Sequence, residues 1–144
     1  MTTVERISDP ARMRALAHPL RLRLLDELTT RHELTATECA AATGESVASC
    51  SFHLRMLAKY GYVEAAPPRG REKPWRLTTG SLEVQPNVAN TESMAAAAAL
   101  ATNVIANESA RLQAFAQRLA TGDVPEWMKG SRMLVHAAWM TEEE

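Results

Sequence analysis

Two cysteines and a histidine fall close together in the chain, where they could bind a metal ion or undergo redox chemistry. Cys50 and His53 lie three residues apart in the stretch GESVASCSFHLRML, residues 44–57, and Cys39 lies just upstream. Three soft ligands that converge on one point can hold Zn²⁺. The same residues can instead pack in a small core between two helices, because a buried free Cys behaves as a small hydrophobic residue. A Cys buried in this way, without a nearby cation, is unreactive, which argues against a thiol switch.

No arrangement typical of an enzyme accompanies these residues. The histidines, His18, His32, His53 and His136, have no Ser/Asp or Cys partner in a recognisable catalytic motif. The chain also lacks a Gly-rich phosphate loop and a paired-carboxylate motif. We therefore predict a protein that is not an enzyme and that needs no cofactor.

Length and composition are those of an ordinary globular domain. The 144 residues are 46% hydrophobic and 23% charged, with a net charge of -1. No apolar run reaches the roughly 18 residues of a membrane span, and the start, MTTVERISDP, lacks the apolar core of a signal peptide. Two cysteines do not make a disulfide framework. We expect a cytoplasmic protein without membrane contact.

Positive charge is concentrated in the first part of the chain. Residues 1–80 hold 12 Lys/Arg and 9 Asp/Glu, a balance of +3, whereas residues 81–144 hold 4 and 8, a balance of -4. Between Arg55 and Arg76 there are six basic residues and two acids. Such a segment in a near-neutral chain indicates a local surface for a polyanion, although a solvated charged surface would have the same composition.

Helix-capping residues divide the first 60 residues into short helices. An Asp-Pro pair, Asp9 and Pro10, begins the first helix, and Thr35 and Glu38 have the spacing of a capping box. Ser46 can cap the helix that contains Cys50 and His53. The predicted helices run from about residue 10 to 17, from 19 onward, from 36 to 42 and from 46 to 60.

The last two of these helices form a helix-turn-helix, because a tight turn that contains Gly44 joins them. Ala40 in the first helix lets the second pack closely, and Cys50 fills the core between them. After Gly61, the stretches YVEAA and REKPWRLT are compatible with two strands, and PPRG marks the turn. Two helices, a helix-turn-helix and a basic hairpin over 62–78 predict a mainly α winged helix with a small β-hairpin.

The helix over 46–60 has a core face and an exposed face. Cys50, Leu54 and Leu57 share the stripe toward the core, and His53 borders it. The opposite face would lie in the major groove of DNA, because a recognition helix presents its N-terminal part to base edges. Basic residues at the hairpin tip suit phosphates or a minor groove. The residues predicted to bind DNA are Ser46, Val47, Ala48, Ser49, Ser51, Phe52, Arg55, Lys59, Arg69, Arg71 and Lys73.

The chain resembles the arsenic- and zinc-responsive repressor (ArsR/SmtB) superfamily of bacterial winged-helix regulators in HPLRLRLLDEL, ELTATECAAATGESVASCSFHLRMLAKYGYVEA and RGREKPWRLT. The resemblance covers about residues 9–79. Within the superfamily, the chain looks most like the non-metal-sensing branch common in actinobacteria. The resemblance implies a homodimer that binds an inverted-repeat operator in double-stranded DNA and usually represses transcription.

The resemblance also bears on the metal hypothesis. Metal-sensing members often carry ELCVCDL before the motif, whereas this chain has Thr35 and Thr37 at the two sensing positions, which cannot supply thiolates. Another known site uses His and carboxylates on the C-terminal helix, but residues 91–121 contain no His and only two acids. Cys39 and Cys50 take the places of apolar core residues. We predict no metal ligands, with zinc held by the two cysteines and a histidine as the alternative.

One long helix is predicted over about residues 91–121, in a C-terminal part, 81–144, that follows a DNA-binding domain over 1–80. Its apolar residues follow steps of four and three, a heptad-like seam broken only by Glu108. We predict that this seam packs against a second copy of the chain; the alternative is packing on its own domain. The seam consists of Met94, Ala98, Ala101, Ile105, Leu112, Phe115 and Leu119.

The segment over 123–144 contains several large apolar residues, which is unusual for a tail. It would cover the core of the dimer, or it would line a pocket for an apolar small-molecule effector. The residues concerned are Trp127, Met128, Met133, Trp139 and Met140.

Two functions fit these observations. One is a dimeric transcriptional regulator, a repressor, with the helix over 46–60 in the major groove and the wing over 62–78 on the flanking backbone or minor groove. The other is a winged-helix module that docks protein partners through the same surface, an alternative that the exposed apolar residues Val47, Ala48 and Phe52 support. The basic wing and Arg55 favour DNA.

Overall fold

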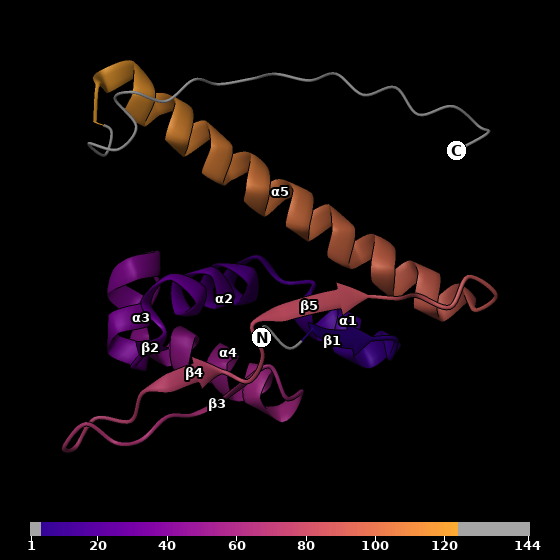
Figure 1. Cartoon of the computed structure of the whole chain (residues 1–144), viewed down its shortest axis with the longest axis horizontal. Coiled ribbons are helices and arrows are strands. Elements are labelled where there is room, and N and C mark those ends of the chain that lie inside the picture. The colour runs from indigo at the N-terminus through magenta and orange to yellow at the C-terminus, as the bar shows by residue number, and fades with distance from the viewer. Residues whose placement is uncertain (1–3, 124–144) are drawn as a thin grey trace. The chain divides into compact units, whose positions relative to one another are not determined.

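The computed structural model describes residues 4–123 and shows a mainly helical winged helix-turn-helix with two small sheets and a long C-terminal helix (Figure 1). The chain divides into two compact units, Met1–Ala110 and Arg111–Glu144. No described helix is both long and apolar enough to cross a membrane. The elements are, in order, β1 (Val4–Ile7), α1 (Pro10–Leu16), α2 (Pro19–Arg31), β2 (Glu33–Leu34), α3 (Ala36–Thr43), α4 (Val47–Lys59), β3 (Val63–Ala65), β4 (Trp75–Leu77), β5 (Ser81–Val84) and α5 (Thr91–Thr121).

Side-chain caps begin the helices where the sequence predicts them. The carboxylate of Asp9 accepts from the N–H of Ala11 at 3.1 Å, and Thr35 with Glu38 forms the complete capping box of α3. The hydroxyl of Ser46 accepts from the N–H of Ser49 at 3.1 Å at the start of α4. Each cap satisfies a backbone donor that a helix end leaves unpaired. The predicted helix boundaries are confirmed to within one residue.

Helices α2, α3 and α4 enclose the main core. Leu24 of α2 and Leu54 and Leu57 of α4 are buried. Cys39 of α3 and Cys50 of α4 are buried in the same cluster, as free thiols. Gly44, at a φ of 74°, makes the left-handed turn between α3 and α4 that a residue with a Cβ would adopt only with strain. The helix-turn-helix is therefore held by an apolar interior to which both cysteines belong.

The wing is part of a three-stranded antiparallel sheet with the order β2-β4-β3. The two-stranded hairpin that the sequence predicts is present as β3 and β4, but β2 adds a third strand through the pairs Glu33↔Arg76 and Leu34↔Trp75. A strand of two residues is too short to show the alternation of apolar and polar residues that indicates a strand. The sequence therefore did not indicate β2. Pro74 lies just before β4, outside the strand, as its missing N–H requires.

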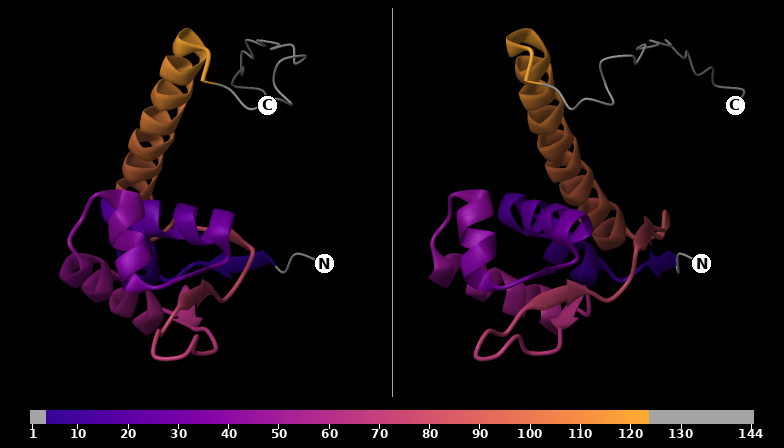
Figure 2. Two further views of the ribbon diagram at one scale, coloured as in Figure 1. Left: turned by 90° about the vertical axis from the view of Figure 1, so that its left-hand side faces the viewer. Right: turned by 60° about the vertical axis from the view of Figure 1, so that its left-hand side comes forward.

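The tip of the wing is a two-residue turn. Arg69 and Glu72 exchange both backbone hydrogen bonds at 3.1 Å, so Gly70 and Arg71 form the turn itself. Gly70 has a φ of 64°, and a tight hairpin turn needs such a residue at its first central position. The two prolines that the sequence suggested as part of this turn precede it. The loop between β3 and β4 extends below the helices in both views of Figure 2, and the turn at its end contains Arg71.

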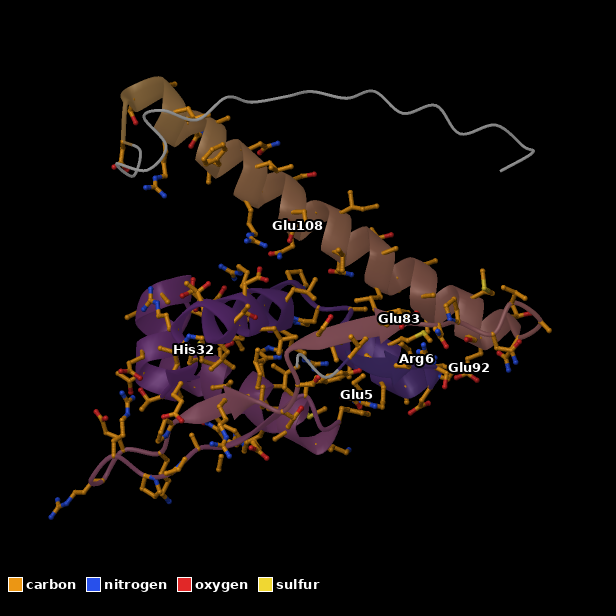
Figure 3. All side chains as sticks on the ribbon, viewed as in Figure 1. Glu5, Arg6, His32, Glu83, Glu92 and Glu108 are labelled. Atoms are coloured by element: carbon orange, nitrogen blue, oxygen red, sulfur yellow. The ribbon has the colours of Figure 1, made fainter. Side chains whose placement is uncertain are left out.

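A short parallel pair of strands, β1 and β5, joins the chain's N-terminal residues to the segment before α5. The guanidinium of Arg6 and the carboxylate of Glu83 meet across the two strands at 3.2 Å (Figure 3). Strand β1 was not predicted, because four residues that pair with a segment 77 positions away carry no local signal. The pair brings β5 onto the domain immediately before α5 begins.

An arginine network ties α1 to the end of α4 and to the wing. The guanidinium of Arg12 donates to Glu5 at 2.6 Å and to the carbonyl of Tyr60 at 3.1 Å. The hydroxyl of Tyr62 donates to the carbonyl of Arg12 at 2.8 Å. Burial raises the pKa of Tyr62 to about 12, so the phenol stays protonated and keeps this donor.

Helix α5 uses one face for its own domain. Ser93, Ala96 and Leu100 are buried, and the amide of Asn107 donates to Asp26 of α2 at 2.8 Å. This face lies away from the predicted seam, whose residues stay exposed in the single chain. The beginning of α5 thus packs with the first compact unit, and the predicted domain boundary at residue 80 stays a prediction.

Candidate nucleic-acid interface

The N-terminal half of α4 presents an exposed and largely apolar surface. Val47 is 46% exposed and Phe52 is 50% exposed, and Ala48 between them is exposed as well. Ser46, Ser49 and Ser51 add small polar groups. Eight residues of α4 and its N-cap are proposed for DNA, and none of them is buried: Ser46, Val47, Ala48, Ser49, Ser51, Phe52, Arg55 and Lys59.

An arginine of α2 positions the turn that precedes α4. The guanidinium of Arg23 donates to the carbonyl of Thr43, at the end of α3, at 3.0 Å. It also pairs with the carboxylate of Glu45 in the turn at 2.9 Å. A cation at the C-terminus of a helix satisfies carbonyls that have no partner in the helix. Arg23 therefore helps to hold the angle at which α4 leaves α3.

His53 contacts Arg21 of α2 and the ring of His18. Its Nδ1 accepts from the Nε of Arg21 at 3.2 Å, and its ring lies 4.3 Å from the ring of His18, centroid to centroid. The Nδ1 of His18 accepts from the N–H of Leu20 and so caps α2. Burial, helped by the charge of Arg21, lowers the pKa of both histidines. The lowered pKa values favour the neutral form of each ring, whose Nδ1 accepts a hydrogen bond.

The cysteines have a different environment from His53. Burial raises the pKa of Cys39 to about 12, which keeps the thiol protonated. The sulfur of Cys50 lies 3.6 Å from the hydroxyl of Thr43. Among residues 4–123, no three His, Cys, Asp or Glu side chains gather as a metal site would require. The ring of His53 contacts Arg21 and His18, whereas both thiols belong to the buried core cluster.

We predict that stability falls as the pH is lowered from about 7.5 to 5.5. His18 and His53 have lowered pKa values in the folded chain, so the unfolded chain takes up protons first, near the ordinary value of 6.5. The free energy of unfolding is thus highest above that value and decreases below it. Urea unfolding followed by circular dichroism at several pH values measures this loss.

A double variant separates the histidines from other acid effects. His18→Asn with His53→Asn keeps an acceptor oxygen near the position of each Nδ1 but removes both titrations. This variant should lose much less stability than the natural chain between pH 7.5 and 5.5. The carboxylate of Glu38 does not contribute to the pH dependence in this range. Its pKa is lowered below 4.5, mainly by the hydrogen bond from the Thr35 N–H and also by the one from Arg69. An unchanged pH dependence in the double variant contradicts the assignment.

The wing contains two kinds of cation. Arg71 and Lys73 are exposed, and neither makes an ion pair or hydrogen bond with any residue of the described range 4–123. The guanidinium of Arg69, in contrast, pairs with Glu38 of α3 at 2.7 Å and with Glu72 at 3.6 Å. Arg69 thus anchors the wing to the start of α3. The sequence identified Glu38 only as a capping residue and did not indicate this second contact.

A hollow of about 380 Å³ separates the wing tip from the start of α3. It is lined by Thr35 to Glu38 on one side and by Arg71 to Lys73 on the other. The two unpaired cations on its rim, Arg71 and Lys73, are suited to oxygen anions such as backbone phosphates. The exposed start of α4 and the cations of the wing tip are therefore the two parts of the candidate interface.

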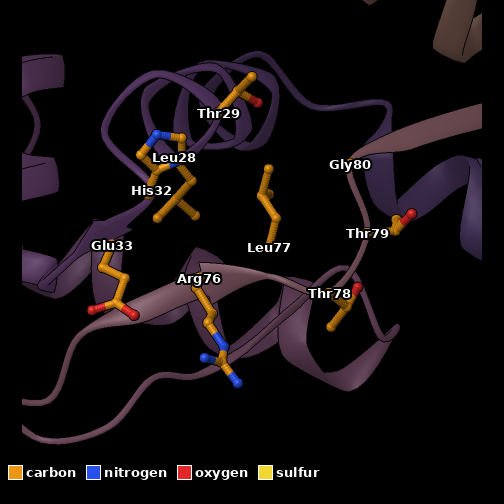
Figure 4. A pocket seen from close by; sticks show the side chains of 9 residues that line it. All are labelled: Leu28, Thr29, His32, Glu33, Arg76, Leu77, Thr78, Thr79 and Gly80. Carbon is orange, nitrogen blue, oxygen red and sulfur yellow. The ribbon is translucent and has the colours of Figure 1, made fainter. Parts of the chain in front are cut away.

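Another hollow, of about 420 Å³, lies between the end of α2 and β4 (Figure 4). Leu28 and Leu77 form its apolar part, with Leu77 pointing toward α2 and Arg76 pointing away (Figure 4). The guanidinium of Arg76 pairs with Glu64 at 2.8 Å. The volume is within the range of small-ligand sites, about 300–1,000 Å³.

The predicted dimerisation seam is exposed along α5. Ile105 and Leu112 are each 66% exposed, and Phe115 and Leu119 are exposed as well. Four large apolar side chains on one helix stripe are unusual for a surface that stays in water. The apolar tail residues that were expected to cover a dimer core or line an effector pocket, Trp127, Met128, Met133, Trp139 and Met140, lie outside the described residues.

Comparison with known proteins identifies a helix-turn-helix in the N-terminal half of the chain. A family model described as "Helix-turn-helix domain" matches residues 16–64, which include α2, α3 and α4. No curated protein matches the chain. Among solved structures, the chain is similar to the homodimeric winged helix-turn-helix DNA-binding domain (fragment 1–100) of a possible ArsR-family transcriptional regulator from Mycobacterium bovis, solved by solution NMR. The identity is 28% and the TM-score is 0.43, over 68% of this chain and 78% of that one.

Proposed function

We propose that this winged helix-turn-helix chain is a dimeric, DNA-binding transcriptional repressor of the ArsR/SmtB kind, in its non-metal-sensing branch. The observation that carries the proposal is the pairing of an exposed α4 N-terminus with a wing whose tip cations, Arg71 and Lys73, have no partner among residues 4–123. Helix α4 enters the major groove, and the wing contacts the flanking backbone or minor groove.

Charge distinguishes this function from the alternative, a module that docks protein partners. An apolar protein interface gains little from unpaired cations around it, because desolvating a charge is costly. Phosphates, in contrast, are bound by such cations with release of counterions. Arg55 on α4 and Arg71 and Lys73 on the wing therefore favour DNA as the partner of this surface.

The dimer is proposed from the seam on α5. Helix α5 already buries Ser93, Ala96 and Leu100 on its own domain, so the exposed stripe through Ile105 and Leu112 is a separate surface. A heptad-like apolar stripe pairs naturally with its counterpart in a second copy. Two copies related by a two-fold axis would present two α4 helices to an inverted repeat.

Selection of bound duplexes from random DNA tests the proposal. We expect the purified full chain to enrich an inverted repeat whose half-sites lie about one helical turn, roughly 34–36 Å, apart. Affinity for the enriched duplex should fall steeply with salt, because several phosphate contacts release counterions. A duplex with the two half-sites scrambled serves as the control. Failure to enrich any sequence, with only weak binding to all duplexes, would favour the protein-docking module instead.

A further inference from the structure

The exposed half of α4 is poor in groups that read bases by paired hydrogen bonds. Side chains that do so are Arg, Lys, Asn, Gln, Asp and Glu. Over residues 46–52 the exposed side chains are instead serines and the apolar Val47, Ala48 and Phe52. The hydroxyl of Ser46 already accepts from the N–H of Ser49, and Arg55, one turn later, donates to Ser51 at 3.4 Å. This surface therefore offers mainly apolar contact.

Phe52, the largest of these side chains, is supported on one side by a second aromatic ring. Its ring meets the ring of His53 edge to face, at 5.1 Å between centroids and 80° between planes. His53 is itself fixed by the hydrogen bond from Arg21 at 3.2 Å and by the ring of His18 at 4.3 Å. An exposed aromatic ring with supported geometry loses little conformational freedom when it binds.

The major groove presents one apolar group, the 5-methyl of thymine. We propose that α4 reads thymine methyl groups, with Phe52 as the principal contact, Ala48 one turn before it on the same stripe and Val47 at the exposed start of the helix. Ala48 and Phe52 lie four residues apart on one helix stripe, about 6 Å along the axis, which is close to the span of two base-pair steps. Each operator half-site should then contain thymines at two positions that lie two base-pair steps apart. This inference rests on the proposed function, since it concerns the same surface.

Replacement of thymine by deoxyuridine tests the assignment, because it removes the methyl group and leaves every hydrogen-bonding group of the base in place. Starting from the selected operator, each half-site thymine is replaced in turn, and affinities are measured for the full chain. A contacted methyl should contribute about as much free energy as one buried CH₂. Its removal is therefore expected to lower the affinity about fourfold. At the position next to Phe52, the variant Phe52→Ala should bind the two duplexes equally.

The matched control is Val88→Ala, which trims an apolar residue that is exposed outside the winged helix-turn-helix core and should keep the full response to the methyl group. Equal affinities for thymine and deoxyuridine at every half-site position overturn the inference and leave the proposed function intact, since the operator was still selected. An undiminished methyl response in Phe52→Ala overturns the role of that ring. A chain that selects no operator overturns the proposed function, and this inference with it. Circular dichroism of both variants shows that the fold is kept.

Discussion

Replacing Ile105 and Leu112 together by glutamate is expected to turn the dimer into a monomer. The two side chains lie seven residues apart on the seam of α5 and are each 66% exposed in the single chain. In a dimer, the variant would place four carboxylates in an apolar interface, where unpaired charge is strongly unfavourable. Sedimentation at micromolar concentration should then show a single species of about half the natural mass.

The same variant should lose most of its operator affinity. Joining two DNA-binding modules raises the affinity for two half-sites by about 10²–10⁴-fold over one module, so a monomer loses a factor of this size. The matched control, Gln113→Glu with Gln117→Glu, adds the same charge to α5 at exposed positions off the seam. It should remain a dimer. A natural chain that sediments as a monomer, or a seam variant that still binds the operator fully, contradicts the dimer proposal.

Removing the two unpaired wing cations should weaken binding to every duplex alike. Arg71→Ala with Lys73→Ala deletes two proposed phosphate contacts in each subunit and four in a dimer. The slope of log affinity against log salt should therefore become shallower by about 3.6, at about 0.9 for each contact. At about 1 kcal/mol for each contact, affinity at low salt should fall roughly 10³-fold.

The salt slope separates this effect from a loss of sequence reading. Phosphate contacts carry no sequence information, so the enriched operator and a scrambled duplex should weaken by the same factor. Arg6→Ala with Arg14→Ala removes equal charge where Glu83 and Glu92 already pair with it, and should change the slope little. If the wing variant keeps the natural salt dependence, the wing does not contact phosphates.

Arg69 illustrates what position in the sequence could not show. In the sequence it is one of three basic residues near the wing tip, equivalent to Arg71 and Lys73. In the structure its guanidinium is held by Glu38 at 2.7 Å, on a helix that begins 33 residues earlier. Whether a cation is available for DNA depends on neighbours that only the fold brings together. Arg69 therefore belongs to the positioning of the wing as much as to its charge.

His53 shows the same limit. Because His53 borders an apolar stripe, the sequence allows two roles for it: a residue of the core or a partner of the thiols. The ring instead contacts Arg21 of α2 and His18, the N-cap of α2, and it lies against the ring of Phe52. A helix stripe indicates which side of a helix a residue occupies, but the partner on that side is set by the crossing of two helices.

Sequence by itself determined the helices, the turn between α3 and α4 and the exposed face of α4. These features depend on caps, glycine conformation and three- or four-residue spacing, all of which act within a few residues. Tertiary structure alone decided the strands β1 and β2, the ion pair that engages Arg69 and the division of α5 between a face for its own domain and a free seam. Strands of two to four residues and side-chain pairs gain their stability from partners distant in the chain, so no local pattern of residues records them.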